Sequence, residues 1–89
     1  SVLLIKEGKL IQQGTPIELI DSVAGHVAQT LCSKEELSKL QKKYPTHNLF
    51  QKRAGFMFRI VGEEFEERFQ LVKNDISLED VFLYYVERV

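Results

Sequence analysis

The sequence has few of the side chains on which metal and nucleophilic sites depend. It contains one cysteine and two histidines, so no disulfide can form within the chain, and the single cysteine fits a reducing cytoplasm. Zinc ligands are usually paired a few residues apart, whereas Cys32, His26 and His47 are not. We interpret them as a small buried thiol and two surface or edge histidines. The sequence therefore predicts no metal site and no catalytic residue.

Glycine is too dispersed to form a phosphate-binding loop. The five glycines stand singly, and the pattern GxxxxGK(S/T) does not occur. That loop binds phosphate through the backbone amides of clustered glycines and through one lysine. The chain by itself is therefore predicted not to bind a nucleotide in this way, and we assign it no cofactor-binding residue.

Charge of one sign and long apolar runs are lacking as well. The formal net charge is −1, which argues against a DNA backbone or an anionic membrane surface as a partner. No run approaches the ~20 apolar residues of a membrane span, and no signal peptide is visible. With 89 residues, 44% hydrophobic and 28% charged, the composition is typical of one small globular domain.

The first quarter of the chain carries clear local signals. Two extended segments, residues 2–5 and 9–13, flank Glu7-Gly8 and predict a β-hairpin. Thr15 can then cap a helix, Pro16 suits its first position, and Glu18 completes a capping box. Gly25 is placed to end this helix.

The remainder predicts an α+β fold. From residue 26 onward we expect a strand, a helix, two strands, a short strand and a helix, over residues 26–32, 33–44, 48–53, 56–61, 69–73 and 78–89. This order indicates one small antiparallel sheet with helices packed on one face, close to a split βαβ or ferredoxin-like arrangement. We place a domain boundary near Gly25, which divides the chain into residues 1–24 and 25–89.

The last helix has the strongest pattern. Ser77 and Asp80 form a capping pair at its start. One apolar stripe follows, made of Leu78, Val81, Phe82, Tyr85, Val86 and Val89. Phe82 is in the middle of the stripe, so we expect it to be buried. In the strand over residues 56–61, Phe56, Phe58 and Ile60 share a face that we assign to the core.

Two charged patterns have alternative interpretations. Four carboxylates lie within residues 63–67, but calcium loops alternate their ligands around a fixed glycine, so we interpret this run as a solvated loop. Two basic pairs, at residues 42–43 and 52–53, are interleaved with Phe50 and Phe56. Such a surface could stack RNA bases. We assign the aromatic residues to the core instead and predict no nucleic-acid partner.

Both ends of the chain resemble one family. The segment IKEGKLIQQGTPIELI, residues 5–20, resembles the strand–turn–strand and GTP-x-E-L sequence of ATP-binding subunits of ABC transporters. The segment ISLEDVFLYYV, residues 76–86, resembles the closing helix of the same subunits. The similarity is greatest to ABC-2-type and multidrug or polysaccharide exporters that carry an extra C-terminal domain.

The resemblance implies a role for each part of the chain. Residues 1–24 would close the ATPase core, and residues 25–89 would form an appended domain that regulates the ATPase or adds dimer contacts. The parent would use ATP and magnesium, bound by residues ahead of Ser1, to drive a membrane permease from the cytoplasmic face of the membrane. No catalytic or metal-binding residue of the family maps onto this sequence, so the fragment itself is expected not to be an enzyme.

Two further function classes remain as alternatives. One is a free-standing α+β domain that senses a ligand, which predicts that the hairpin joins the domain's own sheet. The other is an RNA-binding module, which predicts a basic sheet face. If the hairpin belongs to an ATPase core, its apolar side chains lack their partners, and the fragment should self-associate through residues 1–13.

Overall fold

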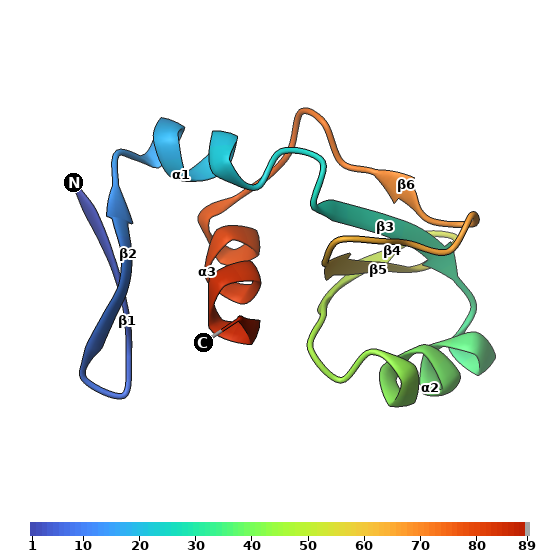
Figure 1. Cartoon of the computed structure of the whole chain (residues 1–89). Helices are drawn as coiled ribbons and strands as arrows, with labels where there is room; N and C mark the ends of the chain where they lie inside the picture. The colour runs from blue at the N-terminus through green and yellow to red at the C-terminus, as the bar shows by residue number, and fades with distance from the viewer. Residues whose placement is uncertain (89) are drawn as a thin grey trace.

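The computed structural model describes residues 1–88 and has the α+β class predicted from the sequence (Figure 1). Its elements in chain order are β1 (Val2–Lys6), β2 (Lys9–Gly14), α1 (Pro16–Ser22), β3 (Val27–Cys32), α2 (Lys34–Lys43), β4 (Asn48–Lys52), β5 (Gly55–Val61), β6 (Gln70–Leu71) and α3 (Leu78–Glu87). Among these residues, no helix is both long enough and apolar enough to span a membrane.

Four strands form the main sheet in the order β4-β5-β3-β6, with every neighbouring pair antiparallel. Strands β3 and β4 both flank β5 and are connected through α2, which is the split βαβ arrangement expected from the sequence. The ferredoxin-like pattern would place a second helix between β5 and β6. Here the connection is made by residues 62–69, which form no helix.

Helix α2 covers one face of this sheet. The register places Phe58 opposite Thr30 and Ile60 opposite Ala28, so their side chains share this face. The core beneath α2 consists of Ala28, Cys32, Leu40, Phe58, Ile60 and Phe69. Phe58 and Ile60 are buried as predicted, and Phe56 packs against this core while remaining partly exposed. Leu71, two residues after the buried Phe69, is exposed at the end of the two-residue β6.

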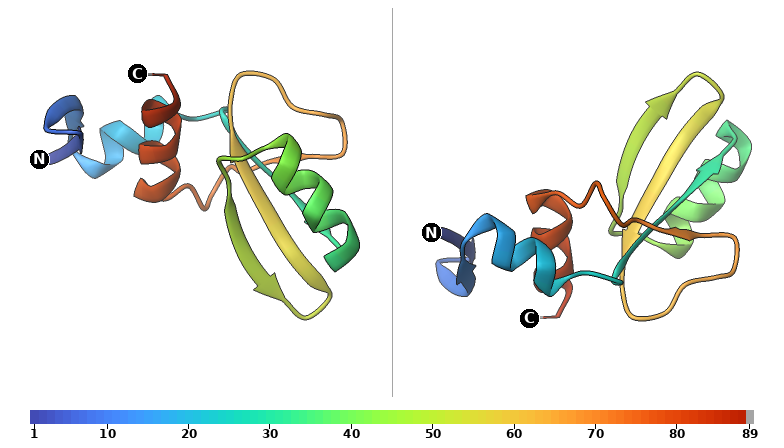
Figure 2. Two further views of the ribbon diagram at one scale, coloured as in Figure 1. Left: turned by 90° about the horizontal axis from the view of Figure 1, so that it is seen from below. Right: turned by 90° about the horizontal axis from the view of Figure 1, so that it is seen from above.

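The hairpin, α1 and α3 build a second core. Its buried members are Leu4, Leu19, Val23, Val27, Val61, Val72 and Val81. Helix α3 therefore packs with α1 and the hairpin, and only α2 covers the face of the main sheet. Figure 2 shows the two groups side by side, which gives the molecule its elongated shape of 39 × 27 × 23 Å. The domain boundary near residue 24 stays a prediction. The second core contains residues from both sides of it, such as Leu19 and Val27.

The hairpin forms a two-stranded sheet of its own. Glu7 and Gly8 both have positive φ, of 51° and 78°, as a tight type I′ turn requires. One side of the hairpin packs on the second core through the buried Leu4. The other side leaves three large apolar residues about half-exposed, at 55% for Leu3, 52% for Ile5 and 54% for Leu10.

Helix α3 turns a different face inward from the one predicted. Val81 is fully buried, whereas Phe82 is 37% exposed, so the prediction that Phe82 lies in the core is wrong. Leu83 and Tyr84, which the predicted stripe left out, pack against the second core. Leu78, Val81 and Tyr85 of the predicted stripe do contact this core, so the buried face keeps part of the stripe and extends to Tyr84 instead of Phe82. Val89, the last member of the stripe, lies outside the described residues.

These burials predict a large difference between two phenylalanines. Phe58→Ala should lower the free energy of unfolding by about 3–5 kcal/mol, because it removes a fully buried ring. Phe82→Ala should lower it by less than about 1 kcal/mol, because that ring is partly solvated. Urea denaturation followed by circular dichroism measures both values. Equal losses for the two variants would contradict this placement of α3.

Candidate functional site

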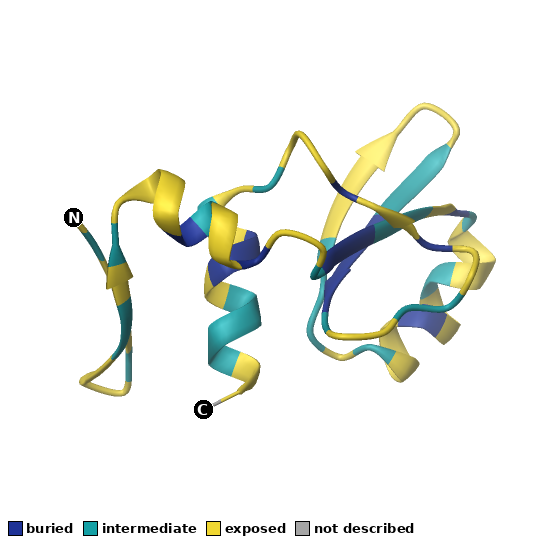
Figure 3. Ribbon diagram, turned by 45° about the horizontal axis from the view of Figure 1, so that its top comes forward, coloured by how far each residue is buried: buried dark blue, intermediate teal, exposed yellow. Residues whose placement is uncertain are grey.

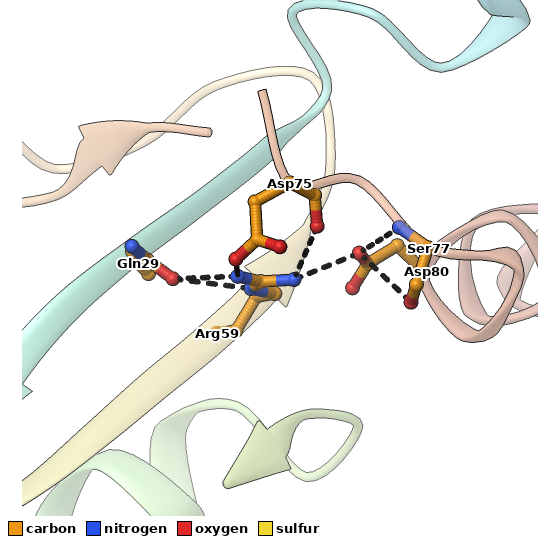
Figure 4. A network of polar contacts seen from close by, with 5 residues as sticks. All are labelled: Gln29, Arg59, Asp75, Ser77 and Asp80. Atoms are coloured by element: carbon orange, nitrogen blue, oxygen red, sulfur yellow. Dashed lines mark hydrogen bonds and ion pairs between the residues drawn. The ribbon is translucent and has the colours of Figure 1, made fainter. Parts of the chain in front are cut away.

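Arg59 lies near the middle of β5, on the face of the sheet away from α2, and is only 4% exposed. Its Nε and Nη2 atoms donate to Gln29 Oε1 at 3.1 and 2.9 Å. Nη2 also donates to Asp75 Oδ2 at 2.8 Å, and Nη1 donates to Asp80 Oδ2 at 3.0 Å and to the Asp75 carbonyl at 3.2 Å (Figure 4). Every guanidinium nitrogen therefore has an acceptor, as burial of an arginine requires.

Asp80 is the fully buried partner of this network. It lies in the first turn of α3, where its Oδ2 atom also accepts from the Ser77 backbone N–H at 2.9 Å. The capping residue predicted from the sequence therefore also forms the ion pair with Arg59. Its Oδ1 atom has no hydrogen-bond partner within residues 1–88. The positive end of the helix dipole favours a carboxylate at this position.

A cavity of about 280 Å³ lies beside this network, between the sheet and the start of α3. It is lined by Gln29, Phe50, Lys52, Met57, Arg59, Asp75, Ser77 and Glu79. The Arg59 guanidinium lies 5.0 Å from the centre of the Phe50 ring, within cation–π range. Lys52 and Glu79 form no ion pair or side-chain hydrogen bond within the described part of the chain.

A second, more apolar cavity of about 350 Å³ adjoins the first. It lies between the beginning of β4 and α3 and is lined by Asn48, Leu78, Glu79, Phe82 and Leu83. Glu79 contributes to both cavities. Together they combine apolar side chains with isolated charges, which is a composition typical of small-molecule binding sites.

Glu63, in the acidic run of residues 63–67, connects the loop after β5 to α3 and to Arg88. Glu63 Oε1 accepts hydrogen bonds from Tyr84 at 2.7 Å and from Arg88 at 2.9 Å. Its other carboxylate oxygen lies 3.2 Å from Nδ1 of His26. These hydrogen bonds, that of Tyr84 first, lower the pKa of Glu63 below its usual value. The run is thus only partly a solvated loop, because Glu63 links the loop to α3.

Glu66 has a similar role beside α2. It accepts a hydrogen bond from the Tyr44 hydroxyl and pairs with Lys43 at 3.1 Å. Burial, together with the bond to Glu66, raises the pKa of Tyr44 to about 12. Glu63 and Glu66 of the run therefore have separate protein partners. Within residues 1–88, no group of three or more acidic, histidine or cysteine side chains is arranged to hold a metal ion.

Each of the three possible soft metal ligands, Cys32, His26 and His47, contacts other groups of the protein. Cys32 is buried, and burial raises the pKa of its thiol, which keeps it protonated and unreactive. His47 stacks on Phe58 with 4.6 Å between ring centres, and its Nδ1 atom lies 2.8 Å from the Tyr44 carbonyl oxygen. His26 has its Nδ1 atom 3.1 Å from the Gly62 carbonyl oxygen.

The aromatic and basic residues considered for RNA stacking do not form one surface. Phe50 lies opposite Met57, on the open face of the sheet. Phe56 lies opposite Cys32, on the face that α2 covers. Lys52 lines the cavity on the open face, whereas Lys42 and Lys43 belong to α2. A row of aromatic residues flanked by cations is therefore not assembled here.

Comparison with models of protein families, with curated protein sequences and with solved structures finds no match for this chain.

The sequence did not predict the network around Arg59. An arginine inside the apolar strand FMFRIV was the available signal, because a charge in such a run needs a buried partner. That partner is 21 positions away, at Asp80, so local spacing could not identify it.

The buried ion pair predicts a strong asymmetry between two arginines. Arg59→Met should lower the free energy of unfolding by about 3–5 kcal/mol, because it leaves Asp80 charged and buried without its partner. Arg68→Met, which removes exposed pairs with Glu36 at 3.6 Å and with Glu66 at 3.9 Å, should cost less than about 1 kcal/mol. Adding Asp80→Asn to Arg59→Met should recover part of the loss in urea denaturation. No recovery would mean that charge is not the cause.

The Glu63 contacts predict a pH effect. Because the pKa of Glu63 is lowered in the folded chain, its contribution to stability is present above the usual value of about 4.3 and is lost as pH falls through the folded value. Tyr84→Phe should raise the Glu63 pKa toward the usual value in an NMR titration. The pKa of Glu66 should stay unchanged, because its partner is Tyr44. A Glu63 pKa unaffected by Tyr84→Phe would contradict this assignment.

Proposed function

We propose that this chain is the C-terminal part of the ATP-binding subunit of an ABC transporter of the ABC-2 or multidrug exporter type. In this proposal it serves the subunit as an accessory domain that regulates it or adds dimer contacts. The parent binds ATP and magnesium through residues outside this chain and drives a membrane permease from the cytoplasmic face of the membrane. The proposal is based on the two sequence segments at the ends of the chain. It is also based on the hairpin, which forms a separate sheet with apolar side chains exposed on its outer side.

The hairpin is the observation that carries the proposal. It forms a separate two-stranded sheet, whereas a free-standing sensor would incorporate it into the main sheet. Its inner side packs on α1 and α3, and its outer side presents Leu3, Ile5 and Leu10 to solvent. Ile17 of α1 is exposed as well. Adjacent exposed apolar side chains typically mark an interaction surface, and we assign this one to the ATP-binding core.

The closing segment has a physical role that fits the same proposal. In SLEDVFL, residues 77–83, Val81 belongs to the core shared with the hairpin, and Asp80 binds Arg59 of the sheet. One short helix thus contacts both the hairpin, where the ATPase core would dock, and the appended sheet. A displacement of the hairpin would be transmitted to the sheet through α3.

A ligand-sensing domain remains the second candidate, because one observation favours it. The cavity beside Arg59 is lined by the apolar Phe50 and Met57 and by two charged residues, Lys52 and Glu79, that form no ion pair among residues 1–88. Small-molecule sites commonly combine apolar walls with a few polar groups. In the proposed transporter subunit, such a site would be an addition to the accessory domain and not a replacement for its role.

The hairpin surface can be tested in the full-length gene product. Upstream of this segment, the gene should encode a phosphate loop and a signature motif. In that protein, Leu3→Ser combined with Leu10→Ser should lower the thermal midpoint by several degrees and reduce ATP hydrolysis, because the docked surface becomes polar. Leu31→Ser combined with Leu71→Ser is the matched control, since these leucines are about equally exposed but lie on the main sheet.

Two results would refute this proposal. One is a gene without a phosphate loop ahead of this segment. The other is a hairpin double variant that behaves like its control in both stability and ATP hydrolysis. The chain on its own should show no ATP turnover above that of a mock purification, because it contains no phosphate-binding loop.

A further inference from the structure

The cavity of about 280 Å³ beside Arg59 contains two residues of opposite charge on different elements. Lys52 ends β4, a strand that is exposed along nearly all of its length (Figure 3), and Glu79 lies in the first turn of α3. Both line the cavity, yet among residues 1–88 neither forms an ion pair. The cavity therefore offers one cation and one carboxylate to a ligand from solvent.

An apolar stretch of the sheet separates the two charges. Glu79 also lines the neighbouring cavity together with Asn48, the first residue of β4. Lys52 is the last residue of β4, ~13 Å further along the strand. Phe50 lies between these ends, opposite Met57 of β5, and both line the cavity. A cation-binding end and an anion-binding end thus lie on either side of an apolar surface.

The end of the cavity next to α3 carries an excess of negative charge. Asp75 and Asp80 share one guanidinium, that of Arg59 (Figure 4). Glu79 adds a third carboxylate in the same helical turn as Asp80. The positive end of the α3 dipole, equivalent to about half a charge, offsets only part of this excess. Oδ1 of the fully buried Asp80 also has no donor within residues 1–88, although buried acceptors normally have one. This end therefore favours a cationic group.

We propose that the cavity binds a small, elongated zwitterion, with its ammonium group at Glu79 and its carboxylate at Lys52. The chain between the two groups lies on Phe50 and Met57. A volume of about 280 Å³ is near the lower limit of small-molecule pockets, so the ligand is short, either an ω-amino acid or a dipeptide with free termini. An α-amino acid fits less well, because its two charges are adjacent.

Such a ligand connects the two halves of the molecule. Lys52 belongs to the main sheet, whereas Glu79 belongs to the helix that packs with the hairpin. A ligand that binds only the folded chain stabilises it, and this one favours the placement of α3 that the Arg59–Asp80 pair also favours. The inference rests on the second candidate function, ligand sensing, and does not depend on the transporter assignment.

The isomers ε-aminocaproate and norleucine test the inference, because they contain the same atoms and differ in the separation of their charges. In an NMR titration of the complete 89-residue chain, ε-aminocaproate should shift the amide signals of Phe50, Lys52 and Glu79 saturably. The expected dissociation constant is about 1 mM, as suits a ligand of about nine non-hydrogen atoms. Norleucine, hexanoate and hexylamine, which each lack one of the two charge contacts, should bind about fivefold more weakly or less.

A dipeptide distinguishes the two sources of this ligand chemistry. Glycylglycine has separated charges as well, but a peptide group replaces the apolar chain. Binding as tight as that of ε-aminocaproate would identify free peptide termini as the ligand, and weaker binding would identify an ω-amino acid. Either result, together with saturable binding of ε-aminocaproate, supports an elongated zwitterion.

Removing one charge at a time separates the two contacts. Lys52→Gln should weaken ε-aminocaproate binding about fivefold and leave hexylamine binding unchanged, because only the carboxylate contact is lost. Glu79→Gln should weaken the binding of both amines and leave hexanoate binding unchanged. Lys42→Gln on α2 and Glu87→Gln on α3 are the matched controls, since both side chains are exposed and neither lines the cavity. Circular dichroism confirms that each variant is folded.

Three results would overturn the proposal. The first is no saturable shift with ε-aminocaproate at about tenfold above the expected dissociation constant. The second is norleucine or hexylamine binding as tightly as ε-aminocaproate, because separated charges are then not recognised. The third is unchanged binding by both Lys52→Gln and Glu79→Gln. None of these results bears on whether the full-length gene encodes an ATPase, and a gene without a phosphate loop would leave this cavity unaffected, so the two proposals fail independently.

Discussion

The ion pair between Arg59 and Asp80 is the contact on which the arrangement of the two cores depends. Arg59 belongs to the sheet that α2 covers, and Asp80 belongs to the helix that packs with the hairpin. Both side chains are withdrawn from water, so a displacement of α3 that separated them would break the ion pair of two groups that are buried in the protein. Such an arrangement is strongly unfavourable. We infer that the pair stabilises one placement of α3 against alternatives. Apolar contacts are not directional, so they alone would fix the position of α3 less precisely.

The position of this pair also explains the composition of α3. Its first turn must supply a carboxylate to Arg59 and to the Ser77 N–H, while the next residue, Val81, enters the core shared with the hairpin. Phe82 is then directed away from that core. An apolar residue at this position is unexplained by the packing of a single chain.

Local chemistry made much of the fold predictable. The capping boxes at Thr15 and Ser33 are both present, and the helices begin where these residues predict. The hairpin turn follows from Glu7-Gly8. The orientation of α3 could not be predicted, because periodicity identifies a helix with an apolar side, but tertiary neighbours decide which residues face inward. The candidate site escaped prediction for a similar reason, since its members come from four separate segments of the chain.

Because the chain has two cores, its parts differ in the free energy that local opening requires. The hairpin contributes a single buried side chain, Leu4, whereas the core beneath α2 is built without any residue of the hairpin. Local opening of β1 and β2 therefore costs less free energy than opening of β3 and β5. In hydrogen-exchange terms, the hairpin belongs to the earlier-opening unit. A partner could engage, reorder or exchange it while the sheet below α2 stays folded.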